Sequence, residues 1–441
     1  MRLPWPLVIA VSAMPAFAQY AGPAILSRGD APAAMASPQV DFRPFADISG
    51  TYTTGLSGLV AGSQGTTTLG NASSGGIQVS FGVSGTHSWK HTKLGLDYGG
   101  SLSRYTNNTY GGYLNQSFLL SLSHQFTPHV TFSLRNSASI ASQPFASPVL
   151  PQAVTFDPTA VYNPPTDFYN NRTISLNSQA GLTFQKSARL SFNLSGLGSL
   201  TERQGGVGLF SATGAGANAD MQYRLTSHST VGVVYSYMHF EYHGTFNATD
   251  VQNVSGSYAF RFSRGLEFTG FGGFSQVEAK FLRTVPLDPA LAALIGLTNG
   301  VVINYSAGYH PTFNVRLSRS FQRGVASLSS SYVVTPGNGL FLTSTALNAS
   351  AGYNFTGLKL WSLGLAASYT QANSLSNVTG SYGDIAGGFS ASRQISHLLH
   401  LTCSVNAMQY RSASFVGYNR LTYSANLGVA VSPGNIPLRV W

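Results

Sequence analysis

The chain has 441 residues, of which only 9% are charged, and 24 Lys and Arg residues outnumber 14 Asp and Glu residues to give a formal net charge of +10. Soluble globular domains usually carry about 25% charged residues. The low charge therefore argues against an ordinary cytoplasmic enzyme. The basic residues are spread thinly, which also excludes the clustered patch that nucleic-acid binding requires.

The N-terminus has the three parts of a secretory signal peptide. Arg2 supplies the positive charge, residues 7–11 form a short apolar stretch, and Ala16 and Ala18 give a small-x-small cleavage site before Gln19. We expect residues 1–18 to be removed between Ala18 and Gln19. The domain organisation predicted from composition is then an Ala- and Pro-rich periplasmic leader over residues 19–40, followed by one barrel domain over residues 41–441.

Alternation of apolar and polar residues is the main structural signal, because side chains of a strand point to opposite faces in turn. The segment 217–226 shows it clearly: Ala217, Ala219, Met221, Tyr223 and Leu225 alternate with Asn218, Asp220, Gln222, Arg224 and Thr226. The longest alternating run covers residues 301–321. Strands of globular sheets usually have about 3–10 residues, so a run of this length favours a tilted membrane strand with an extension beyond the lipid.

The connections alternate between short turns, for example near residues 127–129, 226–228 and 321–323, and longer loops, for example near residues 57–74, 201–212, 282–300 and 336–342. The predicted fold is all-β: a transmembrane antiparallel up-and-down β-barrel of about 18 strands, with about 16 as the alternative, short periplasmic turns and longer outer loops. Trp89 and Trp361 fall at short turns and Trp441 is the last residue. We expect all three to form an aromatic girdle at the periplasmic interface.

With its signal peptide, its alternating strands from about residue 42 to residue 431 and its terminal aromatic residue, the chain resembles porin-like Gram-negative outer-membrane β-barrel proteins. The resemblance is one of architecture and rests on no specific motif. It implies a location in the bacterial outer membrane, contact with lipid and lipopolysaccharide, and insertion by the barrel assembly machinery. The C-terminus departs from the family pattern, because residues 433–437 interrupt the last strand. Either a tail follows residue 431 or the strand bends there.

Charged residues on the polar face of the predicted strands are candidates for lining the lumen. An excess of arginines around a pore favours anionic solutes. The alternative is that each charge is neutralised locally, for instance Asp220 by Arg224, or contacts loops packed inside the barrel. The predicted lumen-lining residues are Asp97, Arg135, Arg189, Asp220, Arg224, Arg261, Glu267 and Arg316.

His239, Glu241 and His243 share one face of a predicted strand and could bind a divalent cation such as Zn²⁺. The alternative interpretation is a polar strand end above the aromatic residues Tyr235 and Tyr237. The sequence shows no further ligand, so no metal and no cofactor is predicted. It also shows no GxSxG motif, and we predict no catalytic residue and no enzyme activity.

Two loops could do more than connect strands. Residues 142–171 are rich in Pro and could constrict the channel, cap the surface or bind a partner, and residues 288–297 suggest a short helix. The leading functional hypothesis is a porin-like channel for passive diffusion of small polar or anionic solutes or saccharides. The alternative is a non-conducting barrel that serves binding, adhesion or surface-polymer export, with a polysaccharide or an export protein as its partner. The sequence leaves homo-oligomerisation undecided.

Overall fold

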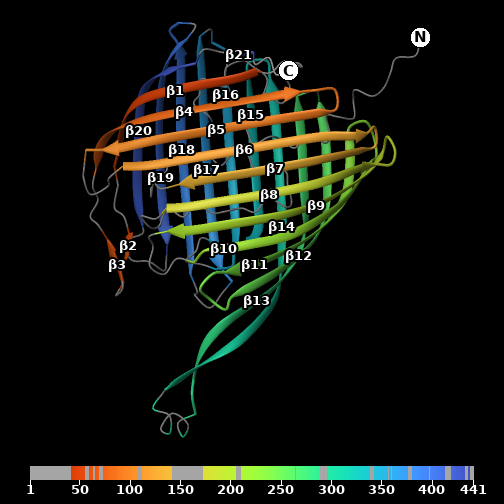
Figure 1. Cartoon of the computed structure of the whole chain (residues 1–441), viewed down its shortest axis with the longest axis vertical. Helices are drawn as coiled ribbons and strands as arrows, with labels where there is room; N and C mark the ends of the chain where they lie inside the picture. The colour runs from red at the N-terminus through yellow and green to blue at the C-terminus, as the bar shows by residue number, and fades with distance from the viewer. Residues whose placement is uncertain are drawn as a thin grey trace.

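The wall of the barrel is a ring in which each strand pairs with a neighbour on both sides (Figure 1). The computed structural model describes residues 41–54, 59–62, 65–68, 73–106, 112–141, 172–204, 210–263, 265–288, 290, 294, 296, 298–337, 342–355, 357–358, 360–375, 380–396, 398–412, 419–432 and 436–437. The signal peptide, the leader, the loop of residues 142–171 and Trp441 lie outside these residues, so the predictions made for them stay predictions.

The ring contains 18 antiparallel strands, as the sequence predicts. Polar and apolar residues alternate along them, so that one face of each strand can be apolar and the other polar. The wall strands are β1 (Asp41–Thr53), β4 (Ser74–Ser88), β5 (Thr92–Tyr105), β6 (Gly112–Thr127), β7 (Val130–Ala141), β8 (Arg172–Gln185), β9 (Leu190–Gln204), β10 (Ala212–Arg224), β11 (Ser229–Tyr242), β12 (Ala248–Ser263), β13 (Leu266–Pro286), β14 (Asn299–Phe321), β15 (Gly324–Thr335), β16 (Ser344–Phe355), β17 (Trp361–Ser374), β18 (Ser381–Gln394), β19 (Leu399–Ser412) and β20 (Arg420–Val431).

The ring closes between its first and last strands. β1 pairs with β20 from Ala46 opposite Val431 to Thr53 opposite Ser424, and with β4 on its other side. A short segment after the last wall strand, β21 (Ile436–Pro437), pairs with the start of β1. The last wall strand therefore ends at Val431, and the chain returns to the rim beside β1.

Three segments expected as loops contain strands. The segment near residues 57–74 holds a small hairpin of β2 (Leu59–Gly62) and β3 (Gly65–Thr68), which is separate from the wall. β9 continues to Gln204 and β13 to Pro286, so the loops predicted at residues 201–212 and 282–300 were too long. Within the predicted short helix, Ala290 and Leu294 are helical, and the Asp288 carboxylate accepts a hydrogen bond from the Ala290 backbone N–H.

β13 and β14 continue beyond the wall as a two-stranded ribbon (Figure 1). They pair with each other up to Pro286 opposite Asn299, whereas β12 pairs with β13 only as far as Lys280, and β15 pairs with β14 only from Phe313. Pro311 lies just before the point where β14 leaves β15. Proline has no backbone N–H to donate to a second neighbour, so it is tolerated at a strand edge. This explains why the pairing between β14 and β15 does not extend to Pro311.

The two faces of the wall differ sharply in polarity. Val254 on β12 and Phe274 on β13 are paired and point outward, with 58% and 66% of their surface exposed. Their sequence neighbours Ser255 and Ser275 point inward and are 2% and 1% exposed. The inward-facing apolar residues gather at the long-loop end, where Ala212, Phe240, Tyr242, Val251 and Val277 form a buried cluster.

Candidate functional site

The interior of the barrel is lined mainly by small polar side chains. Buried Ser, Thr and Asn residues occupy the inward face of most strands, for example Asn218 on β10, Ser236 on β11, Asn314 on β14 and Asn348 on β16. Side-chain atoms of Asn218, Asn314 and Asn348 have no hydrogen-bond partner within the described part of the chain. Buried polar groups in proteins are almost always hydrogen-bonded to protein or to water. These amides therefore provide sites for ordered water along the inner wall.

Most of the predicted lumen-lining residues lie on the inward face. Asp97, Arg135 and Arg316 lie within strands, opposite other inward-facing residues of the neighbouring strands. Arg189 differs, because it belongs to the turn before β9 and is exposed. The remaining predicted residues occupy inward-facing positions at or near the short-turn end: Asp220, Arg224, Arg261 and Glu267.

The structure shows which groups contact two of these charges. The Asn193 side-chain amide donates a hydrogen bond of 2.9 Å to the Asp220 carboxylate. The Arg224 guanidinium donates to the backbone carbonyl oxygens of Thr226 and Ser227 in the following turn. Each of these side chains therefore has polar contacts close to its own strand end.

Sequence analysis missed four inward-facing charged residues: Asp47, Lys93, Arg203 and Asp384. The Asp47 carboxylate accepts a hydrogen bond of 3.0 Å from the Thr402 hydroxyl, two strands away around the ring. Lys93 and Arg203 add two positive charges to the interior, and Asp47 and Asp384 add two negative charges, so the positive excess inferred from the predicted arginines is unchanged. Alternation along β1 and β18 was the signal that could have placed both residues inside.

Arg203 lies where two opposite parts of the wall approach each other. It is 9% exposed, and its guanidinium donates a hydrogen bond of 2.6 Å to the Phe210 carbonyl oxygen. It also interacts electrostatically with the phenol groups of Tyr242 on β11 and Tyr382 on β18. Because β9 and β18 are separated by eight strands in either direction around the ring, this electrostatic interaction acts across the long-loop end of the lumen.

The last residues of the connection between β15 and β16 reach the same end of the lumen. The Tyr242 hydroxyl donates to the Leu342 carbonyl oxygen at 2.6 Å and lies 3.0 Å from the Thr343 hydroxyl. The Thr343 hydroxyl also lies 2.7 Å from the hydroxyl of Thr249 on β12. The end of this connection is thus held against strands three to five places away around the ring. We call Arg203, Tyr242, Thr343 and Tyr382 the mouth cluster.

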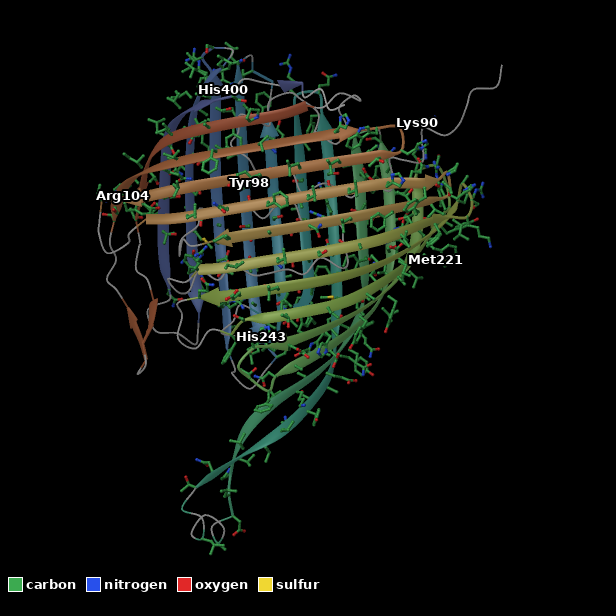
Figure 2. The ribbon with its side chains drawn as sticks, viewed as in Figure 1. Lys90, Tyr98, Arg104, Met221, His243 and His400 are labelled. Atoms are coloured by element: carbon green, nitrogen blue, oxygen red, sulfur yellow. The ribbon has the colours of Figure 1, made fainter. Side chains whose placement is uncertain are left out.

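The three residues considered as candidate metal ligands, His239, Glu241 and His243, do not converge. Both ring nitrogens of His239 face carboxylates, with Nδ1 2.8 Å from Asp250 and Nε2 3.3 Å from Glu241. His243 lies beyond the end of β11 and is exposed (Figure 2). Across the described ranges, no group of three or more His, Cys, Asp or Glu side chains could hold a metal ion. The metal-binding interpretation therefore has no geometric support, and these residues form a polar strand end on the outer face.

The outer surface carries exposed apolar side chains around the ring, including Ile48 on β1, Leu102 on β5, Leu194 on β9, Val254 on β12 and Leu365 on β17. Trp89 and Trp361 lie at the short-turn end, as the girdle prediction requires. The Trp89 ring packs edge-on against His87 with 4.1 Å between ring centroids.

Among the described residues, no helix is long and apolar enough to cross a bilayer.

No family model matches the chain. No curated protein matches it either. Three of the similar solved structures are the FrpB iron transporter of Neisseria meningitidis, at 12% identity and a TM-score of 0.40, the ferric citrate transporter FecA, at 12% and 0.43, and the outer membrane protein OpdK of Pseudomonas aeruginosa, at 12% and 0.39. The matches cover 84%, 90% and 89% of this chain, and 62%, 64% and 98% of the respective structures. The chain thus spans less than two thirds of the length of the two iron transporters.

Proposed function

We propose that the chain is a porin-like channel of the bacterial outer membrane, through which small polar solutes, including anions and saccharides, diffuse passively. The observation that carries this proposal is the opposite polarity of the two faces of a closed 18-strand ring. An apolar exterior matches lipid, and closure satisfies the backbone hydrogen bonds of the wall without water. Rings of about 16–18 strands are wide enough for an aqueous channel.

The mouth cluster sets the selectivity in this proposal. Arg203 places a positive charge at the long-loop end of the lumen, and its Nε has no hydrogen-bond partner among the described residues. A guanidinium group in such a place attracts anions and hydrogen-bonds to their oxygens. The inward-facing carboxylates elsewhere keep the interior close to electrical balance. We therefore expect a modest preference for anions and not an exclusion of cations.

A second candidate is a non-conducting barrel that serves binding, adhesion or surface-polymer export. Contacts across the long-loop end favour it, because Tyr242, Thr343 and Tyr382 are each almost completely buried. The β13–β14 ribbon also favours it, since it presents exposed Tyr305 and Tyr309 beyond the wall. In that case the partner is a surface polysaccharide or an export protein, and a homo-oligomer is a further alternative.

Single-channel recording in a planar bilayer separates the two functions. The purified protein is first checked for a closed barrel by its heat-modifiable gel mobility, and conductance is then measured in a salt gradient. Stable conductance steps with a modest anion preference are expected for the channel. A barrel that folds but never conducts would eliminate the channel and leave the binding or export function.

A further inference from the structure

The outer face of the barrel carries an uneven charge at the short-turn end. Besides Arg189 in the turn before β9, five exposed basic side chains lie there on outward-facing positions or in the turns: Lys90, Lys186, Arg319, Arg323 and Arg393. Within the described ranges, no Asp or Glu occupies an outward-facing position at this end. We call these five basic residues the basic rim.

The opposite end of the same face is electrically balanced. Arg104, Arg172, Lys280 and Arg411 there are accompanied by Glu202, Glu241, Asp250 and Glu278, all on outward-facing positions. Figure 2 labels Lys90 and Arg104 at opposite ends of the wall. The positive charge is therefore a property of one rim and not of the outer surface as a whole.

Aromatic rings hold part of the basic rim at the boundary of the apolar surface. The Arg319 guanidinium carbon lies over the Phe321 ring, 4.8 Å from its centroid, and that of Arg393 lies over the Trp361 ring at 5.4 Å. Exposed aromatic rings favour the headgroup level of a bilayer. In a bilayer the stacked guanidinium groups would therefore lie at the depth of lipid phosphates.

We propose that the basic rim binds the phosphate groups of anionic phospholipids in the leaflet that it contacts. A guanidinium fork matches two phosphate oxygens, and an ammonium group adds a compact positive charge. Each basic residue near an anionic lipid surface adds to the attraction. The inference rests on the membrane position of the proposed function but not on conduction through the barrel.

The test uses the full-length protein in mixed micelles of phosphatidylglycerol and phosphatidylcholine, with native mass spectrometry counting the lipids retained. One variant combines Lys186→Gln, Arg319→Gln, Arg323→Gln and Arg393→Gln. The matched control combines Arg104→Gln, Arg172→Gln, Lys280→Gln and Arg411→Gln, which removes the same charge from the opposite end. Heat-modifiable mobility shows that each variant still forms a closed barrel.

We expect the wild type and the control to retain phosphatidylglycerol in preference to phosphatidylcholine, and the rim variant to lose that preference by about five-fold or more. Equal losses in both variants, or no preference in the wild type, would overturn the proposal.

Displacement of phosphatidylglycerol by millimolar inorganic phosphate would assign the rim to free anions instead. Binding of a polyglutamate peptide without any lipid preference would assign it to an acidic protein. A barrel that retains phosphatidylglycerol but never conducts would contradict the channel function alone.

Discussion

The hydroxyl group of Tyr242 on β11 donates a hydrogen bond of 2.6 Å to the carbonyl oxygen of Leu342, which lies 100 residues further along the chain. Tyr242 is 3% exposed, so little water can replace the bond if it is lost. The bond joins one part of the wall to the connection between β15 and β16. The Tyr242 hydroxyl therefore holds the end of that connection against β11 through two groups, the Leu342 carbonyl oxygen and the Thr343 hydroxyl.

Tyr242→Phe should loosen the long-loop end of the lumen. The substitution keeps the ring but leaves the Leu342 carbonyl oxygen without its donor, at a cost of about 1–3 kcal/mol, while the Thr343 hydroxyl keeps Thr249 as its partner. We expect larger and noisier conductance steps in single-channel recordings. Tyr369→Phe is the control, because the Tyr369 hydroxyl donates to Gln371 on the exposed face. Identical conductance in the two variants would show that this bond does not control the mouth.

Replacing inward-facing arginines should reduce the anion preference. Arg135→Gln and Arg316→Gln each remove a positive charge from the inner wall, which lowers the local concentration of anions in the lumen. The reversal potential in a salt gradient is expected to move by several millivolts toward the value of a non-selective pore. Arg411→Gln on the outer face should leave it unchanged. A shift of the same size in Arg411→Gln would mean that overall charge, and not the inner wall, sets selectivity.

Two adjacent glycines on β13 should respond in opposite ways to alanine. A Cβ atom at Gly273 would overlap the Val254 carbonyl oxygen and press on Ser255, whereas a Cβ at Gly272 would have no atom within 4 Å. Gly273→Ala should therefore lower the temperature at which the barrel unfolds in heat-modifiable gel shifts, and Gly272→Ala should not. If both variants unfold like the wild type, β12 and β13 must be able to move apart at no cost.

Charge placed on the outer face should destabilise the barrel only where that face meets lipid. Val254→Arg puts a guanidinium on the apolar surface near the middle of β12, which costs about 2–4 kcal/mol at the bilayer midplane. We expect a corresponding loss of folded barrel in urea titrations with lipid vesicles. Leu294→Arg, at a side chain 81% exposed beyond the wall, provides the comparison and should have no effect. Equal destabilisation at both positions would argue against the membrane assignment.

The strand architecture could be predicted from the sequence because alternation is a local property. Each wall strand carries its own apolar and polar faces, and the count of 18 follows from the sequence of turns and loops. The inward position of Arg203 was not predicted, because Glu202 and Arg203 are adjacent charged residues. The end of β9 therefore shows no alternation and has the pattern of a loop. The β2–β3 hairpin was not predicted either, because strands of only four residues are too short to show a clear alternation.

The candidate site depends on contacts that no local pattern contains. The approach of Arg203 to Tyr382 joins opposite parts of the wall, and the bond from Tyr242 to Leu342 spans 100 residues. Conversely, His239 and Glu241 share one face of β11 as predicted, but His243 lies in the turn beyond the strand, and β12 brings Asp250 beside His239 and thereby occupies its Nδ1. The spacing of residues predicts which face of the strand His239 occupies. Which group His239 binds depends on the neighbouring strand β12.

The long strand β14 has two mechanical regimes. From Phe313 to Arg319 it is paired with strands on both sides, which resists bending in the plane of the sheet. From Asn299 to Thr312 it is held by β13 alone, and because β12 pairs with β13 only as far as Lys280, the ribbon can flex and twist as a unit about the pair of Lys280 and Tyr305. A pull on the tip of the ribbon is therefore absorbed as bending at that hinge and reaches the wall only weakly.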